Sequence, residues 1–373
     1  MVVGHFLKWM ETARVSERAA AAGALARTYI DAEMSFEDRC AAEAALTLLL
    51  DDPSAKVRMA LADALSMSRH APMQIVSALA ADQPEVAALV LARSPLLTDA
   101  DLIDRVASGA PSTQRLIAAR PGVSMGLSAA IAEVGEAEAC MALLENPSAD
   151  IALLSFCRMA ERHGDIAPLR AALLGDGRLP SNCRHMLLVK LGDALKSSPL
   201  VIAMMGAARA ERVTREACVK ASLTLIDNTP PAEFAALVEH LRIRGDLTAS
   251  FLVRTVAHGK IDFFGSVLVA LTAQGEARVR AMLAGGRDVA LSSLFRKAGL
   301  SVAVHGVILR ALKVWREVAN GKRVAGAQEV TWLMLKELGE QAQGSDLANL
   351  LKSIHLEALR ENARSHALAI TAA

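Results

Sequence analysis

Apolar and polar residues alternate along much of this chain with the period of an α-helix. In the segment DDPSAKVRMALADALS, residues 51–66, Val57, Leu61 and Leu65 recur at helical spacing. Lys56 falls on the opposite side, so the segment predicts an amphipathic helix that buries one face. The preceding AALTLLL predicts a second apolar helix that packs antiparallel against the first.

The residues just before Val57 are of the kind that begin helices. Pro53 suits a first helical turn, because proline fixes φ and no backbone donor is needed there. Asp52, which follows Asp51, can accept hydrogen bonds from the free amide groups of the first turn. We therefore expect Asp51, Asp52 and Pro53 to have a structural role.

A proline between two apolar helical segments recurs downstream. Similar intervals separate Pro53, Pro84, Pro147 and Pro180 if the gap between Pro84 and Pro147 counts as two intervals. Within that gap lies Pro111, slightly out of phase. A period of roughly 32 residues, with two helices in each period, is typical of an α-solenoid. The sequence therefore predicts an all-α protein in which helix pairs bury their apolar faces by stacking on one another.

The period weakens beyond about residue 200, where longer apolar helical patterns appear. We expect three regions along the chain: a repeat array over residues 1–200, divergent helical repeats over 201–300, and terminal helices over 301–373. The terminal helices could cap the array, since a last repeat must turn a polar face outward, or form a small bundle of their own.

Composition supports a helical protein without a strong overall charge. Of the 373 residues, 53% are hydrophobic and only 3% aromatic, a bias that favours helices over sheets. The net charge of +1 excludes a global field toward nucleic acid or anionic membranes. Residues 1–160 nevertheless carry −7 and the remainder +8. No run of apolar residues is long enough to span a membrane, and the five cysteines form no CxxC pair, so we expect a cytoplasmic protein.

Three blocks in the first half of the chain, SPLLTDADLI (94–103), IAARPGVS (117–124) and LLENPSADI (143–151), resemble an uncharacterised bacterial family. This domain-of-unknown-function family is common in alphaproteobacteria and is built of HEAT-like helical repeats. Residues 258–300 resemble its second recurring block, and the resemblance spans roughly residues 40–300. It implies HEAT-like helix pairs, but no activity, cofactor or catalytic residue.

The resemblance also implies a role for Arg58. In HEAT-like repeats, an arginine at this point of the second helix commonly bonds to an aspartate in a neighbouring turn. We expect Arg58 to bind Asp51, Asp52 or a turn in the next repeat, as a structural contact rather than a binding site.

Residues 278–323 carry ten basic residues against Asp288 and Glu317. If they share a face, an acidic or phosphorylated partner could dock there; if they lie on several helices, they only solvate the surface. The residues that we single out for an anionic partner are Arg278, Arg280, Arg287, Arg296, Lys297, Arg310 and Lys313.

Phe263 and Phe264 form the densest aromatic pair in a chain with few aromatic residues. Adjacent residues do not share one helix face, so at least one should lie in the core. An exposed partner would be a plausible interface anchor.

Signals for catalysis, cofactors or metals are weak. Cys183 and His185 are close in sequence, but two residues apart on a helix they point to different faces. We therefore expect no enzyme, no cofactor and no metal. The favoured function is a scaffold or adaptor that binds another protein along the solenoid surface. The alternatives are binding of nucleic acid or another polyanion through the basic half, and, less favoured, an enzyme on a helical-repeat frame; the oligomeric state stays open.

Overall fold

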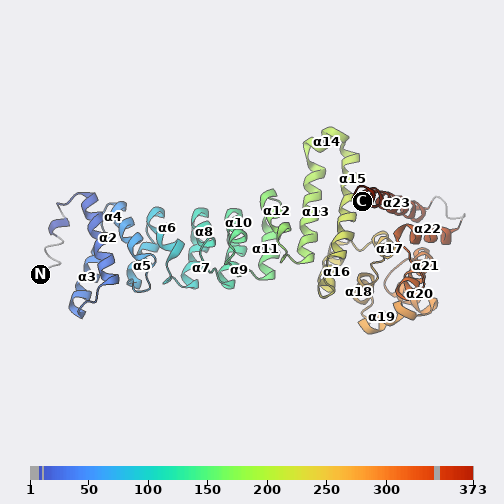
Figure 1. The fold of residues 1–373 in the computed structure, drawn as a ribbon, viewed down its shortest axis with the longest axis horizontal. Coiled ribbons are helices and arrows are strands. Elements are labelled where there is room, and N and C mark those ends of the chain that lie inside the picture. The colour runs from blue at the N-terminus through green and yellow to red at the C-terminus, as the bar shows by residue number, and fades with distance from the viewer. Residues whose placement is uncertain (1–7, 11, 340–344, 373) are drawn as a thin grey trace. The chain divides into compact units, whose positions relative to one another are not determined.

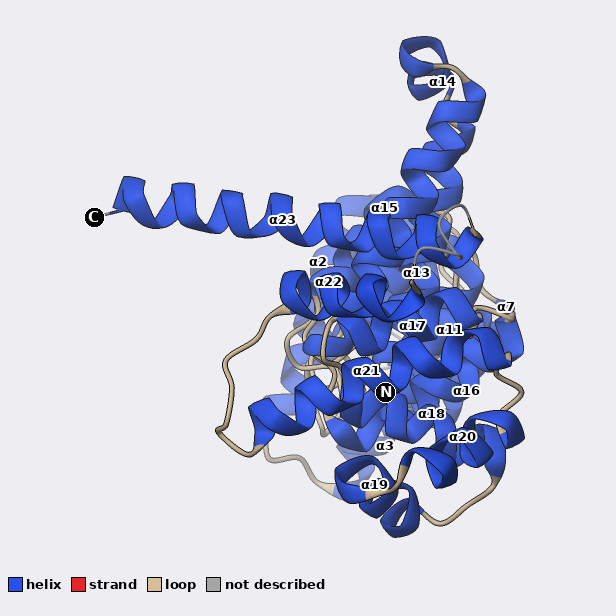
Figure 2. Cartoon of the chain, turned by 90° about the vertical axis from the view of Figure 1, so that its right-hand side faces the viewer, coloured by secondary structure: helices blue, strands red, loops and turns tan. Residues whose placement is uncertain are grey.

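The computed structural model describes residues 8–10, 12–339 and 345–372. Within these residues all regular structure is helical and no β-strand occurs (Figure 2). The prediction of an all-α protein is therefore confirmed. The chain divides into two compact units, Met1–Leu179 and Pro180–Ala373.

The first unit is a series of mostly short helices connected by short turns (Figure 1). The helices are α2 (Val15–Asp31), α3 (Phe36–Leu49), α4 (Ala55–Leu65), α5 (Met73–Ala80), α6 (Pro84–Arg93), α7 (Asp99–Ser108), α8 (Pro111–Ala118), α9 (Met125–Val134), α10 (Ala137–Glu145), α11 (Leu153–His163) and α12 (Ala167–Gly175). Each even-numbered helix from α2 to α10 packs against the next even-numbered one, and α7, α9 and α11 pack in the same serial way. Neighbouring helices such as α5 and α6 form pairs.

The spacing of the helix pairs is shorter than the prolines predicted. The second helices of successive pairs, α4, α6, α8, α10 and α12, begin at Ala55, Pro84, Pro111, Ala137 and Ala167. Each of these starts follows the previous one by less than the roughly 32 residues that the proline spacing indicated. Pro84 and Pro111 are the first residues of α6 and α8, whereas Pro147 lies in the turn before the odd-numbered α11. The predicted period is therefore wrong, because these prolines do not occupy equivalent positions.

Polar side chains in this unit satisfy the free carbonyl groups at the ends of neighbouring helices. Arg120, which is buried, donates to the carbonyl oxygens of Leu91 and Ser94 at the end of α6. Arg162 donates to those of Ala132 (3.0 Å) and Gly135 (2.8 Å) at the end of α9. A guanidinium at this place also complements the negative end of the helix dipole. These contacts connect the turn after α8 to α6, and α11 to α9.

The second unit contains both short and long helices. They are α13 (Ser181–Ser197), α14 (Pro199–Met205), α15 (Ala207–Asp227), a 3₁₀ turn η1 (Pro231–Glu233), α16 (Phe234–Arg244), α17 (Ala249–Ala257), α18 (Ile261–Thr272), α19 (Glu276–Gly285), α20 (Asp288–Lys297), α21 (Val302–Ala319), α22 (Ala327–Leu338) and α23 (Asp346–Ala372). The helix α13 packs along α15, and α17 contacts α18, α21, α22 and α23. Residue 200, where we placed a boundary from the sequence, lies inside α14 and thus within this unit.

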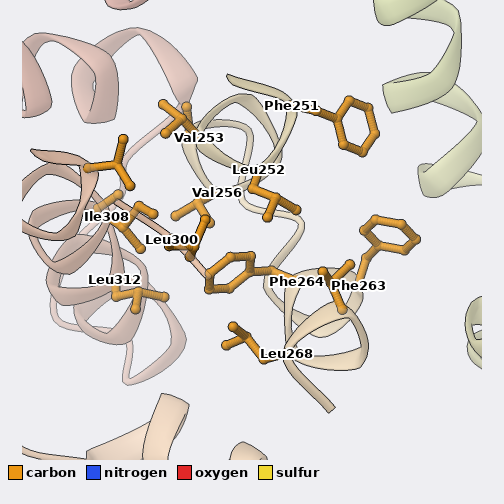
Figure 3. Close-up of a cluster of buried hydrophobic side chains, with 14 of the residues drawn as sticks. Phe251, Leu252, Val253, Val256, Phe263, Phe264, Leu268, Leu300, Ile308 and Leu312 are labelled. Carbon is orange, nitrogen blue, oxygen red and sulfur yellow. The ribbon is translucent and has the colours of Figure 1, made fainter. Parts of the chain in front are cut away.

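A hydrophobic core runs through α15 to α23 of the second unit. Figure 3 shows the part of it around α17, α18 and α21. Phe263 and Phe264 lie near its centre and are 1% and 0% exposed. The ring of Phe263 packs edge-to-face on Phe234 at 5.5 Å between centroids, and that of Phe264 on Phe295 at 6.0 Å. The suggestion that one of these two residues is an exposed interface anchor is wrong. Both are buried because α18 contacts α16 and α17 as well as α19 and α20, which leaves neither phenylalanine on a solvent face.

Candidate functional site

A cavity of about 440 Å³ lies among helices α13, α15, α16 and α17 of the second unit. Its size falls in the range of small-molecule sites. Apolar side chains line much of it, including Val189 from α13, Val219 from α15, Leu241 from α16 and Phe251 from α17. Its most buried polar side chain is a histidine from α13, His185.

The imidazole of His185 is almost completely enclosed, with 4% of the residue exposed. Its Nε2 lies 3.1 Å from Oγ of Ser222 on α15. The Ser222 hydroxyl donates to the carbonyl oxygen of Cys218 at 2.8 Å, so the histidine Nε2 carries the proton and donates to Ser222. Nδ1 is then a bare acceptor, and it has no hydrogen-bond partner among the described residues.

Burial keeps this histidine neutral. Removal from water, together with the neighbouring His240 ring, lowers the pKa of His185 to about 4. The two rings meet edge-to-face with their centroids 5.4 Å apart, and burial lowers the pKa of His240 as well. Neither ring therefore serves as a cation at neutral pH.

The close approach of α13 and α15 beside the cavity depends on Gly192. A Cβ atom at this position would lie 2.5 Å from Sγ of Cys218. Burial raises the pKa of the Cys218 thiol, so it stays protonated and is a poor nucleophile. The glycine thus allows a close contact between two helices, and the thiol fills that contact.

Charged groups around the cavity are already neutralised by neighbours. Four basic side chains of the cavity wall each form an ion pair, namely Lys196 with Asp193 (2.7 Å), Arg215 with Glu211 (2.6 Å), Arg244 with Asp246 (2.9 Å) and Arg254 with Glu357 (2.8 Å). An anionic ligand would have to displace one of these carboxylates. The cavity is therefore poorly suited to an anionic ligand.

The side chains of the cavity do not form an activated nucleophile. Ser222 directs its proton at a helix carbonyl rather than at His185, and the free Nδ1 has no carboxylate to orient the ring, in contrast to a serine–histidine–aspartate triad. No group of three or more histidine, cysteine or acidic side chains that could hold a metal ion occurs in the described part of the chain. Cys183 and His185 are both buried on α13.

A second cavity of about 490 Å³ lies beside α18, α19 and α21. Its carboxylate Glu276 pairs with Arg280 at 2.8 Å. Another of its basic side chains, Arg316, donates to three carbonyl oxygens at the end of α19, those of Met282, Leu283 and Gly286. This cavity therefore holds no unpaired buried charge that would mark a reaction centre.

Residues 86–348 match the family described as "Uncharacterised protein conserved in bacteria (DUF2336)". The chain belongs to this family. The resemblance noted over residues 40–300 thus identifies an uncharacterised family correctly, although the match begins later and extends further. No curated protein and no solved structure matches the chain.

Both cavities and the seven basic residues singled out from the sequence lie within the DUF2336 match. The seven basic residues singled out from the sequence lie on α19, α20 and α21 or at the start of α20. Arg280 pairs with Glu276, and Lys313 pairs with Asp288 at 2.8 Å. Among the described residues, no ion pair is formed by Arg278, Arg287, Arg296, Lys297 or Arg310.

These five unpaired basic residues do not gather at one point. Arg287 and Arg296 lie at opposite ends of α20, which separates them by about 13 Å along the helix at its usual rise of about 1.5 Å per residue. Arg278 lies on α19, and Arg310 on α21 is only partly exposed. The arrangement resembles solvated helix surfaces more than a single anion site.

Asp52 and Arg58, two of the four residues that we assigned a structural role, lie at the contact between successive helix pairs. Arg58 forms a bidentate ion pair with Asp82 (2.6 and 3.0 Å) and donates to the carbonyl oxygen of Asp52. Asp52 in turn pairs with Arg18 at 2.8 Å and accepts from the Ser54 amide. Of the partners expected for Arg58, the one that forms the ion pair is an aspartate in a turn of the next repeat, Asp82 between α5 and α6. Asp51 and Pro53 are exposed, and α4 begins after them at Ala55 with Ser54 as its N-cap. The prediction that Pro53 lies in the first turn of this helix is therefore wrong.

Two features of the second unit were missed in the sequence. The buried contact between His185, Ser222 and His240 joins three helices. The three residues are far apart in the sequence, so no short motif predicts the contact. The apolar run PLVIAMM at residues 199–205 forms α14, and every residue of this helix is exposed or partly exposed. In the sequence, this helix is marked by a proline at its start, a glycine after its end and the absence of polar residues between them.

Proposed function

We propose that the first unit is an α-solenoid of HEAT-like helix pairs, and that the chain is a non-enzymatic cytoplasmic scaffold or adaptor that binds another protein along this unit. The proposal is supported by one repeated feature of the surface. The first residue of four odd-numbered helices, α3, α5, α9 and α11, is a large apolar side chain that faces solvent. These residues are Phe36, Met73, Met125 and Leu153, and Leu153 is followed by the exposed Leu154.

Topology supports a common location for these side chains. Helices joined by short turns run antiparallel to their neighbours, so alternate helices of a serial array run in parallel. The first residues of the odd-numbered helices then lie along one edge of the unit. Phe36 and Leu154 are each 82% exposed, which costs free energy in water unless a partner covers them.

A row of separated apolar side chains suits an extended protein segment better than a small molecule. Each would fill one pocket of the partner or contact one apolar residue of it, and the binding energy would come from a few such anchors. The row is interrupted at α7, whose first residue is Asp99. We therefore infer an extended apolar segment of a protein as the ligand of this edge.

The other two functions receive less support. An enzyme would require a cavity that holds a group with a displaced pKa. The pKa of His185 is displaced, yet the hydrogen-bond pattern around Ser222 provides no activated nucleophile. Binding of nucleic acid or another polyanion is weakened because Arg280 and Lys313 already have carboxylate partners. The scarcity of aromatic residues also argues against stacking on single-stranded bases.

Site-specific photo-crosslinking in living bacteria tests the scaffold proposal. A benzophenone amino acid at position 36, 125 or 154 should crosslink to one and the same protein, at peptides that mass spectrometry can map. The same probe at the exposed residues Arg115 of α8 and Glu138 of α10 serves as the control and should give no such product. Equal crosslinking at all five positions, or none at the first three, would refute the proposal.

A further inference from the structure

The short helix α14 forms the tip of a hairpin made by α13 and α15 in the second unit. Figures 1 and 2 both show α14 at the far end of this hairpin, away from α16 and α17. From Asp193 to Ala217 only Ala210 is buried, so the outer part of the hairpin packs on little besides itself. None of the described helices is both long enough and apolar enough to cross a membrane.

The tip exposes more apolar surface than a soluble helix needs. Its seven residues, PLVIAMM, include no polar side chain and no buried residue. Leu200 is 69% exposed and Met204 75% exposed, with Ile202 and Met205 also exposed. Exposed apolar residues are normal when they are scattered, but a contiguous group of them marks a surface that binds something.

The charges around the tip are mainly basic. Residues 195–213 contain Lys196, Arg209 and Arg212 against one acidic residue, Glu211, which pairs with Arg215 at 2.6 Å. Lys196 reaches back to Asp193 in an exposed pair, which is weak in water. Arg209 and Arg212 form no ion pair with any described residue. An apolar tip thus lies beside a collar of net positive charge.

We propose that this tip, residues 195–213, inserts into the interface of a membrane that contains anionic phospholipid. A seven-residue helix is about 10 Å long, which matches the roughly 5–10 Å depth of interfacial insertion and falls far short of the roughly 30 Å needed to span the hydrocarbon core. The apolar side chains would enter the acyl boundary while Lys196, Arg209 and Arg212 contact headgroup phosphates. This inference does not rest on the proposed function of the first unit.

The arrangement favours a lipid surface over a second copy of the chain. In a symmetric dimer the same patch faces itself, so the collars of two tips would bring like charges together. The tip is also apolar all round, because α14 has no buried side, and a lipid interface can cover every side of an inserted helix. A flat protein surface would cover only one.

Flotation of the full-length chain with lipid vesicles tests the proposal. We expect binding to vesicles of phosphatidylcholine with about one third phosphatidylglycerol, and at least roughly tenfold weaker binding to pure phosphatidylcholine. The double variant Leu200→Ser/Met204→Ser should lose at least roughly tenfold in affinity for the anionic vesicles. Arg209→Gln/Arg212→Gln should mainly reduce the preference for anionic lipid.

A matched control uses equally exposed apolar residues of the same unit. Ile243 on α16 and Val289 on α20 are 73% and 82% exposed, and Ile243→Ser/Val289→Ser should bind vesicles like the unchanged protein. Circular dichroism and urea unfolding show whether each variant is folded. A tryptophan at position 204 adds a second readout, since its fluorescence should shift to the blue on addition of anionic vesicles, whereas a tryptophan at position 243 should not respond.

Three results would overturn the proposal. They are a folded protein that fails to float with anionic vesicles, a loss of binding in the control variant as large as that in the tip variant, and a dimer in analytical ultracentrifugation that Leu200→Ser/Met204→Ser dissociates. The last result would assign the tip to self-association instead.

Discussion

The contact of α13 with α15 at Gly192 leads to a prediction about the substitution Gly192→Ala. Whether this substitution raises or lowers the free energy of unfolding should depend on the residue at position 218. In Gly192→Ala the new Cβ would lie 2.5 Å from Sγ of Cys218, and 3.4 Å from Cγ2 of Thr214. The first distance is too short for any real contact, so the sulfur or the helices must move. The second is an ordinary contact, so removal of the sulfur should remove most of the clash.

Two opposing effects set the magnitude. Alanine in place of glycine inside a helix stabilises by about 1 kcal/mol. Overpacking of a well-packed contact costs about 1–3 kcal/mol. Gly192→Ala should therefore lower the free energy of unfolding by up to about 2 kcal/mol in the natural sequence. In a Cys218→Ala background the same substitution should raise it by up to about 1 kcal/mol.

Urea unfolding of the four proteins in this cycle measures the effect. Trp315 and Trp332 report on the second unit, and a Trp9→Phe substitution in all four proteins removes the signal of the first. Gly306 on α21 provides the control, because a Cβ there meets no atom within 4 Å, so Gly306→Ala should stabilise in both backgrounds. If Gly192→Ala changes stability equally with and without Cys218, the two helices are not in the close contact described.

Three further substitutions test the contacts on which the fold and the cavity depend. Arg58→Ala should destabilise the first unit by about 1–3 kcal/mol in urea unfolding, since it leaves the partly buried Asp82 without its partner; an effect below about 0.3 kcal/mol would contradict this. Because burial lowers the pKa of His185 to about 4, the unfolded chain binds more protons between this value and about 6.5, so stability should rise with pH across that window. His185→Gln should remove about 2 kcal/mol of the rise between pH 5 and 7, and an unchanged pH profile would refute the neutral buried imidazole. Arg316→Ala should cost about 1–3 kcal/mol by freeing three carbonyl groups of α19, whereas Arg310→Ala, a helix neighbour without such contacts, should cost less than about 0.5 kcal/mol.

The helical class and the buried faces of single helices could be predicted from the sequence because both follow from local spacing. Val57, Leu61 and Leu65, chosen by their period, are all completely buried. The length of the repeat could not be predicted from prolines, because a proline is tolerated both in the first turn of a helix and in the turn before one. Pro84 and Pro147 occupy these two different places.

The cavity could not be predicted because its parts come from distant positions. His185 and Ser222 are 37 residues apart, and His240 lies on yet another helix. Only the packing of α13 against both α15 and α16 brings the three together. The burial of adjacent Phe263 and Phe264 has the same origin, since a helix enclosed on several sides does not follow the one-face rule of an amphipathic surface helix.

Counts of residue types do not show which charged and which apolar side chains are available to a partner, and the physical reason is the same for both. Arg316 counted as surface charge, yet its guanidinium binds the carbonyl oxygens that end α19. The apolar run of α14 has the composition of a core helix, yet its residues face water. A charge becomes available to a partner only if no carboxylate or helix end has taken it, and an apolar side chain becomes a binding surface only if no neighbouring helix covers it. Both conditions depend on the packing of the helices. We therefore propose two places to test for function, where apolar side chains stay exposed: the first residues of α3, α5, α9 and α11, and the tip at α14.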